Sequence, residues 1–254
     1  MLNRLALLSS VLCLSGCLAT QIVPSTASEI TPKQNSKTQW DYFTEVYEIE
    51  HDPYPFVGSL HDDNRLIGSG VLIKPNVILT AGHVAEHNPT VFRTTDGVEQ
   101  CVKEIVLHPE YQPYPAWPKF IEHDMAIIFL EGPATVAPIE NYTPGNILQH
   151  TPLTTIGYSK GIKKYSNSNT FWYYGRLVEE PEEVIFLPLK ATVWFGDSGG
   201  AVIAHTGGKS VLIGIISSFA MSEDKIYECA AASTHYYNNW IEEVLNERLE
   251  GMVR

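Results

Sequence analysis

The sequence predicts an all-β fold in two halves, followed by a single C-terminal helix. Short apolar runs of strand length recur between residues 55 and 216, and turn residues separate them at short intervals. Between these runs the sequence has no sustained helical periodicity of the kind that a βαβ crossover needs. An amphipathic pattern with helical spacing comes only near the end of the 254-residue chain. These observations favour a β-barrel or a β-sandwich over an α/β fold.

The first half consists of apolar runs separated by Gly, Pro, Asn and Asp, residues that tolerate the dihedral angles of tight turns. The polar connection from Glu131 to Gly145 is the expected boundary between the halves. The strands predicted before it are Phe56–Leu60, Gly68–Ile73, Val77–Thr80, Val102–Leu107 and Met125–Leu130.

The second half repeats this organisation and ends in the helix. Residues 159–170 are rich in Lys, Ser, Asn and Gly, so we expect an exposed loop there. Ser233 or Thr234 is suited to cap the helix. Its apolar face, spaced three and four residues apart, is Trp240, Ile241, Val244, Leu245 and Leu249. The predicted strands are Leu153–Gly157, Phe171–Tyr174, Glu183–Leu187, Ala201–Ala204 and Ser210–Ile216.

The N-terminus has the pattern of an export signal. Residues 1–16 combine Arg4 with an apolar run that is too short for a stable membrane span. The run ends Leu-Ser-Gly-Cys, which resembles the lipobox of bacterial lipoproteins and implies lipidation of Cys17 after cleavage. We therefore expect residues 17–40 to be a lipidated cysteine and a flexible tether on a bacterial outer membrane or cell surface. The alternative is an ordinary signal peptide and a secreted or periplasmic protein.

Composition excludes several classes of partner. The net charge of −12 argues against nucleic acid, because such binding depends on cationic contacts to phosphates. The nine histidines are scattered without the close spacing of a metal site, so no metal or cofactor is expected. We expect a monomer. An exported protein could pair Cys101 with Cys229, but two unpaired thiols are the favoured interpretation.

A glycine-rich turn contains the candidate nucleophile. In Gly196-Asp197-Ser198-Gly199-Gly200, the glycines allow the backbone to approach a substrate closely, and an apolar strand follows. Backbone amides of such a turn can converge on one oxygen and stabilise the charge of an acyl-transfer intermediate. A serine nucleophile also needs a neighbouring base, because its hydroxyl is barely ionised at neutral pH.

Two further motifs supply a base and a carboxylate. His83 follows Ala81 and Gly82 at the end of a predicted strand, and these small neighbours leave room for an imidazole facing a cleft. Asp124 comes directly before a buried strand, where a carboxylate can be desolvated and still orient a histidine ring. Each residue alone has an ordinary structural explanation. The order His, Asp, Ser makes the combination more specific.

These motifs resemble those of trypsin-like serine proteases with the chymotrypsin fold. The resemblance covers about residues 54–245, in the order found in the family. The main motifs are Thr80–His83, Asp124–Ile128 and Gly196–Gly200, and the supporting ones are Tyr54–Leu60, His108–Tyr111 and Asn239–Ile241.

The resemblance implies two six-stranded antiparallel β-barrels, a protein or peptide substrate and a serine endopeptidase mechanism. Ser198 would attack the scissile carbonyl, His83 would transfer the proton and Asp124 would orient the imidazole. The amides of Gly196 and Ser198 would form the oxyanion hole, and Ser217 would support the aspartate and pair with substrate. The implied protease domain covers residues 41–254, with barrels at about 41–140 and 141–232 and a helix at about 233–250.

The chain departs from the family pattern in its activation and disulfide motifs. Residues 38–53 contain nothing like the Ile-Val-Gly-Gly N-terminus whose amine normally pairs with the aspartate before the serine, here Asp197. We therefore expect activity without that cleavage, or an internal partner for Asp197. Val84 and Trp194 stand where many relatives have cysteine, which suits a bacterial or phage-type member.

The primary specificity pocket also differs. Its floor would be Thr192, so cleavage after basic residues is not expected, and Ile216 replaces the histidine of glutamate-specific relatives. Phe219 and Cys229 fall where small residues usually leave the pocket open, so we expect a small or medium uncharged side chain before the scissile bond.

Two other functions compete with the peptidase. A non-catalytic peptide- or protein-binding module could use the same scaffold, although all three catalytic motifs are intact. An α/β-hydrolase esterase would require an α/β chain and the order Ser, Asp, His, and the sequence has neither.

Overall fold

The computed structural model describes residues 31–32, 47–48, 52–113, 123–142, 151–168, 171–174, 183–186, 193–222 and 225–252. The predicted signal peptide 1–16, the lipidation residue Cys17 and the pocket residue Thr192 lie outside these residues. β1 (Thr31–Pro32) lies in the predicted tether and pairs antiparallel with β2 (Tyr47–Glu48), which lies in the predicted protease domain.

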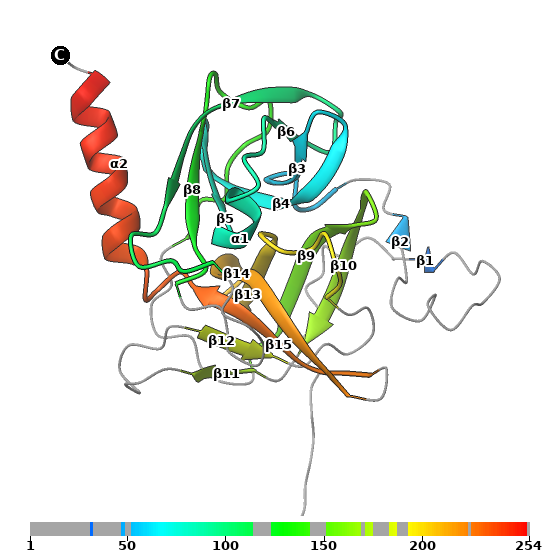
Figure 1. The fold of residues 1–254 in the computed structure, drawn as a ribbon. Coiled ribbons are helices and arrows are strands. Elements are labelled where there is room, and N and C mark those ends of the chain that lie inside the picture. Colours follow the sequence, from blue (N-terminus) through cyan, green and yellow to red (C-terminus); the bar gives the residue numbers. More distant parts are fainter. Residues whose placement is uncertain are drawn as a thin grey trace, which may run out of the picture.

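The first half forms a closed barrel of six antiparallel strands, the upper unit in Figure 1. A four-residue helix, α1 (Gly82–Ala85), follows β5 directly. The strands in barrel order are β3 (Val57–Asp62), β4 (Arg65–Lys74), β5 (Val77–Thr80), β8 (Ala126–Leu130), β7 (Glu99–Leu107) and β6 (Val91–Arg93). Every residue of β5 and β8 is buried, as the continuous apolar runs in the sequence predict.

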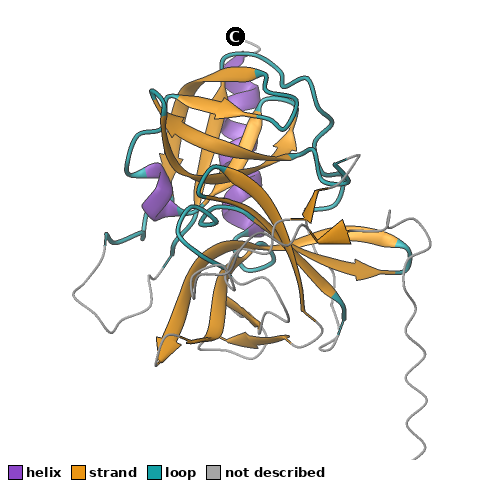
Figure 2. Ribbon diagram, turned by 90° about the vertical axis from the view of Figure 1, so that its right-hand side faces the viewer, coloured by secondary structure: helices purple, strands orange, loops and turns teal. Residues whose placement is uncertain are grey.

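The second half is a seven-stranded antiparallel sheet in the described residues, one strand more than expected. Figure 2 shows it below the barrel. In sheet order its strands are β10 (Ile162–Ser168), β9 (Leu153–Ser159), β13 (Ala201–Thr206), β14 (Lys209–Ser222), β15 (Lys225–Ser233), β12 (Glu183–Phe186) and β11 (Phe171–Tyr174). The prediction of two β units and a C-terminal helix is confirmed.

The predicted loop at residues 159–170 is wrong. Residues 162–168 form β10, which pairs with β9 along its whole length. The polar composition of this segment is typical of an exposed loop, but the segment contains buried side chains. Lys164 is 4% exposed and Tyr165 is 8% exposed, and both side chains have buried partners. The short β6 and the alanine-containing β15 also lack a clear apolar pattern and were not predicted.

The C-terminal helix α2 (Asn238–Met252) packs beside the first barrel, at the left in Figure 1. It begins later than predicted because Ser233 ends β15 and Thr234 donates its hydroxyl to the carbonyl of Leu212. Arg248 forms an ion pair with Glu104 of β7, which fixes the helix to the barrel. None of the described helices is long and apolar enough to cross a membrane.

The two β units share one hydrophobic core, so their junction is packed without a break between them. The cluster that fills the barrel, around Leu60 and Phe92, continues to Ile156 and Ile203 of the second sheet and to Ile241 of α2. A smaller cluster around Val202 and Ile213 fills the opposite side of the second sheet. Side chains placed at the junction are therefore held from both sides.

Candidate active site

Strand pairing brings His83 and Asp124 together. β5 and β8 are antiparallel neighbours, and Thr80 at the end of β5 pairs with Ala126 at the start of β8. The residues just after β5 and just before β8 therefore lie at the same edge of the barrel. Ser198 reaches this edge from the loop that precedes β13 of the second sheet.

The Asp124 carboxylate holds both the backbone and the ring of His83. Its Oδ1 accepts the His83 amide N–H at 2.8 Å, and its Oδ2 lies 2.8 Å from His83 Nδ1. The Ser217 hydroxyl donates to the same Oδ2 at 2.5 Å. Asp124 is 1% exposed, so these donors replace water around the charge. Because Nδ1 pairs with Asp124, Nε2 is the ring nitrogen of His83 that is left to interact with another group.

The surroundings raise the pKa of His83. Burial alone would lower it, but the negative charge and hydrogen bond of Asp124, together with the charge of Glu86, outweigh burial. The imidazole therefore has a greater affinity for a proton than a free histidine, which is what a general base for a serine hydroxyl requires.

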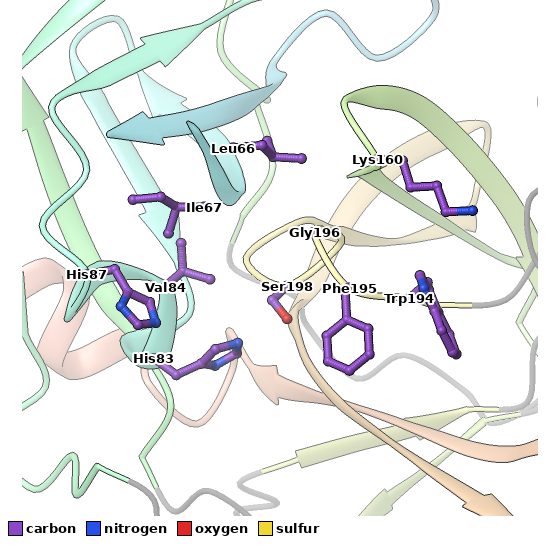
Figure 3. A pocket seen from close by; sticks show the side chains of 10 residues that line it. All are labelled: Leu66, Ile67, His83, Val84, His87, Lys160, Trp194, Phe195, Gly196 and Ser198. Atoms are coloured by element: carbon purple, nitrogen blue, oxygen red, sulfur yellow. The ribbon is translucent and has the colours of Figure 1, made fainter. Parts of the chain in front are cut away.

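His83 and Ser198 line one pocket of about 390 Å³ between the two β units, and their side chains point toward one another in Figure 3. The Ser198 hydroxyl also lies 3.4 Å from the carbonyl oxygen of Ser217. The pocket is lined by Leu66, Ile67, His83, Val84 and His87 from the barrel side and by Lys160, Trp194, Phe195, Gly196 and Ser198 from the second half.

Two amides beside the nucleophile are available to a ligand. Gly196 and Gly199 have φ angles of +97° and +83°, which glycine adopts without strain. A Cβ at Gly196 would lie 2.4 Å from the carbonyl oxygen of Tyr158, so no larger residue fits. Within the part of the chain that the structure describes, the N–H groups of Gly196 and Ser198 have no protein acceptor. These are the two amides that the resemblance assigns to the oxyanion hole.

Ser69 of β4 supports this loop, and sequence analysis missed it. Its hydroxyl donates to the Gly196 carbonyl at 2.8 Å and accepts the Tyr158 N–H at 2.9 Å. Its own amide donates to the Ser198 carbonyl at 2.8 Å, and its carbonyl accepts the Thr80 hydroxyl at 2.8 Å. A serine in a strand carries no sequence signal for such contacts across the two β units.

Asp197 has an internal partner, as one of the two sequence-based alternatives anticipated. Lys164 of β10 places its Nζ 2.6 Å from Asp197 Oδ2, and the side chains are 5% and 1% exposed. Burial raises the pKa of Asp197 to about 6, although the charge of Lys164 opposes this shift. Lys164 could not be identified from sequence because its segment has the composition of a loop.

Aromatic side chains close the region next to the nucleophile. Phe219 stacks on Trp194 with ring centroids 5.5 Å apart and an interplanar angle of 18°. Phe195 contacts both rings edge-on and is 72% exposed. Cys229 pairs with Phe219 across β14 and β15 and is fully buried. Cys101 and Cys229 are both free thiols, in agreement with the favoured interpretation.

The expectation that the histidines are scattered is wrong for one pair. His108 and His123 stack with ring centroids 5.0 Å apart, and the potential ligand atoms of these residues and Glu110 lie within 4.8 Å of one another. Burial and the neighbouring His123 lower the pKa of His108 to about 4, so its ring is neutral at neutral pH. Both rings pack edge-on against Tyr237, before α2, and His123 Nε2 lies 3.5 Å from a carboxylate oxygen of Glu110.

Two β units with a histidine, an aspartate and a serine at their junction define a protein of the chymotrypsin-fold class. The trypsin family profile matches residues 44–241. The chain therefore belongs to the trypsin family.

Known proteins agree with this assignment. Granzyme M of Homo sapiens is 29% identical over 86 residues, which cover 31% of this chain and 32% of granzyme M. The match thus spans about a third of the length of that relative. The structure of kallikrein-related peptidase 10 superimposes with a TM-score of 0.60 at 19% identity, covering 77% of this chain and 97% of that chain. This likeness concerns the fold.

Proposed function

We propose that the protein is a serine endopeptidase that hydrolyses peptide bonds through Ser198, His83 and Asp124. The observation that carries the proposal is the meeting of three elements in one pocket: the Asp124-bound His83, the Ser198 hydroxyl and two unoccupied amides. Together they provide a base, a nucleophile and oxyanion donors for acyl transfer.

In the proposed mechanism His83 Nε2 takes the proton of Ser198 as Oγ attacks the scissile carbonyl. The C–O bond forms, and the carbonyl electrons move to an oxyanion that the Gly196 and Ser198 amides stabilise. The resulting imidazolium is stabilised by Asp124 and gives its proton to the leaving amine, which leaves an acyl-enzyme. Water, activated by the same histidine, then releases the acid product.

We propose that the residue before the scissile bond has a small or medium uncharged side chain. The Phe219–Trp194 stack fills space beside the nucleophile, and the Phe195 ring packed against it extends this apolar surface. We also propose that the protein is an exported monomer, bacterial in type and anchored through lipid on Cys17. The export and the lipid anchor rest on the N-terminal sequence, and the bacterial type rests also on Val84 and Trp194, which stand where many relatives have cysteine.

A peptide library with each residue in turn before the scissile bond tests the activity and its specificity. We expect wild-type protein to cleave after Ala, Val or Thr in preference to Arg, Glu or Trp, and Ser198→Ala to abolish cleavage. Equal cleavage after Arg would contradict the proposed pocket, and no cleavage of any peptide by the folded protein would favour the binding-module alternative.

A further inference from the structure

The Lys164–Asp197 ion pair is shielded from solvent on both sides. Its atoms lie 2.6 Å apart, and neither side chain is more than 5% exposed. Burying two charges costs several kcal/mol per ion, and their attraction offsets this cost only when the geometry is good. The net contribution of such a pair to stability is therefore small. We expect its main effect to be on the geometry of the loop that contains Asp197.

Asp197 uses the other contacts of its side chain to shape the turn before the nucleophile. The oxygen that pairs with Lys164 also accepts the Trp194 N–H at 2.7 Å, and the Asp197 amide donates to the Trp194 carbonyl at 2.9 Å. These two bonds close the turn and leave Gly196 at a φ angle of +97° with its amide unpaired among the described residues. The carboxylate position and the amide orientation are thus coupled.

The carboxylate of Asp197 fits tightly in its site. A Cβ at Gly157 would lie 2.8 Å from its Oδ1, so this glycine is needed to make room for it. Its Oδ1 is buried without a hydrogen-bond partner in the described residues. Lys164 is the cation that compensates this charge. Without it, an uncompensated carboxylate would remain in an apolar site, which favours withdrawal of the loop toward solvent.

The strand that carries Lys164 is fixed from its other face. Lys163 donates from Nζ to Asp52 at 2.6 Å and to the carbonyls of Tyr54 and Val57 at 2.7 and 2.8 Å. Tyr165 donates its hydroxyl to Asp52 at 2.6 Å. Successive side chains of a strand point to opposite faces. Lys163 and Tyr165 therefore contact the segment that leads into β3, and Lys164, between them, contacts the loop that contains Ser198.

We propose that Lys164 is a positioning residue that keeps the oxyanion amide of Gly196 in place, and that the peptidase consequently requires no newly liberated N-terminal amine. The inference rests on the proposed serine peptidase function and names how that site is kept active. Because the cation comes from within the chain, the protein is active on folding, and any N-terminal extension or tether leaves the site intact.

Lys164→Met tests the positioning role, with Lys209→Met as the matched control because Lys209 is an exposed lysine at the first residue of β14. Loss of one oxyanion donor lowers kcat by roughly 10²–10³-fold, so we expect a loss of this size in Lys164→Met. We expect KM to change by less than about threefold and Lys209→Met to match wild type. A Lys164→Met enzyme with wild-type kcat would overturn the proposal.

If Lys164→Met fails to fold, the double variant Lys164→Met/Asp197→Asn removes both charges and with them the cost of an unpaired buried carboxylate. We expect it to fold, as judged by circular dichroism, and to show the same loss of kcat. Wild-type kcat in this variant would overturn the proposal.

The independence from a new N-terminus is tested with a protein that carries a permanent N-terminal peptide extension. We expect intact mass to show an uncut chain that reacts with a fluorophosphonate at the wild-type rate. Reaction only after a cut within residues 38–53 would overturn the inference while leaving the peptidase function standing. Failure of every form of the folded protein to react or to cleave peptides would instead count against the proposed function.

Discussion

Replacing Asp124 with asparagine isolates the contribution of the buried carboxylate. Asparagine has nearly the same shape but offers one acceptor oxygen and one NH₂ group. The His83 amide is always a donor, so the asparagine oxygen is expected to stay at the Oδ1 position, 2.8 Å from it. The NH₂ group then faces His83 Nδ1 at the position where Oδ2 now lies.

This arrangement selects the wrong tautomer of His83. With Nδ1 forced to accept a hydrogen bond, the ring proton moves to Nε2, and the ring can no longer accept the proton of Ser198. A change of this kind lowers kcat by about 10⁴-fold. At 1.36 kcal/mol per tenfold change, that is about 5 kcal/mol of transition-state stabilisation.

The assay is steady-state hydrolysis of a peptide amide near pH 8 by wild type, Asp124→Asn and Ser217→Ala. Ser217→Ala removes one donor to Asp124 and leaves the pairing with the imidazole, so we expect a loss of less than about 100-fold. Near-ultraviolet circular dichroism checks that all three proteins share one fold. An Asp124→Asn enzyme with kcat within tenfold of wild type would refute the assigned role of the carboxylate.

Two other predictions concern specificity and pH. Phe219→Gly removes the ring stacked on Trp194, so we expect the ratio of kcat/KM for Phe over Ala before the scissile bond to rise by at least about tenfold; an unchanged ratio in the peptide library would show that Phe219 does not limit the pocket. Because the pKa of His83 is raised, we expect kcat/KM to begin falling above pH 6.5 as the pH is lowered. Below that pH the protonation of Asp197, with a pKa of about 6, should make the fall of kcat/KM steeper. A single limb at or below pH 6.5 would contradict both assignments.

The sequence was informative where residue type and chain order carry the chemistry. The strand Val77–Thr80 has the predicted bounds. The strand predicted at Met125–Leu130 begins one residue later, at Ala126, and all of its residues are buried. Because these strands pair, the positions of His83 and Asp124 follow from the motifs themselves. The binary pattern of apolar runs therefore predicted both strands, and the pairing that brings His83 and Asp124 to one edge is a finding of the structure.

Polar side chains that are buried in pairs could not be predicted from the sequence. Lys163 and Lys164 are both buried, yet consecutive lysines beside Ser and Asn have the composition of an exposed loop. Their partners Asp52 and Asp197 are distant in sequence, so no local pattern reveals the pairing. Ser69 was missed for the same reason, since its bonds to Gly196 and Tyr158 form only when the two β units come together.

Covalent labelling shows whether Ser198 is the nucleophile of this protein. Wild-type protein and Ser198→Ala are incubated with a fluorophosphonate, and the adduct is located by intact mass and peptide sequencing. We expect one adduct per chain, attached to Ser198 in the wild type and absent from Ser198→Ala. A folded wild-type protein that stays unlabelled, or an adduct that persists in Ser198→Ala, would contradict it.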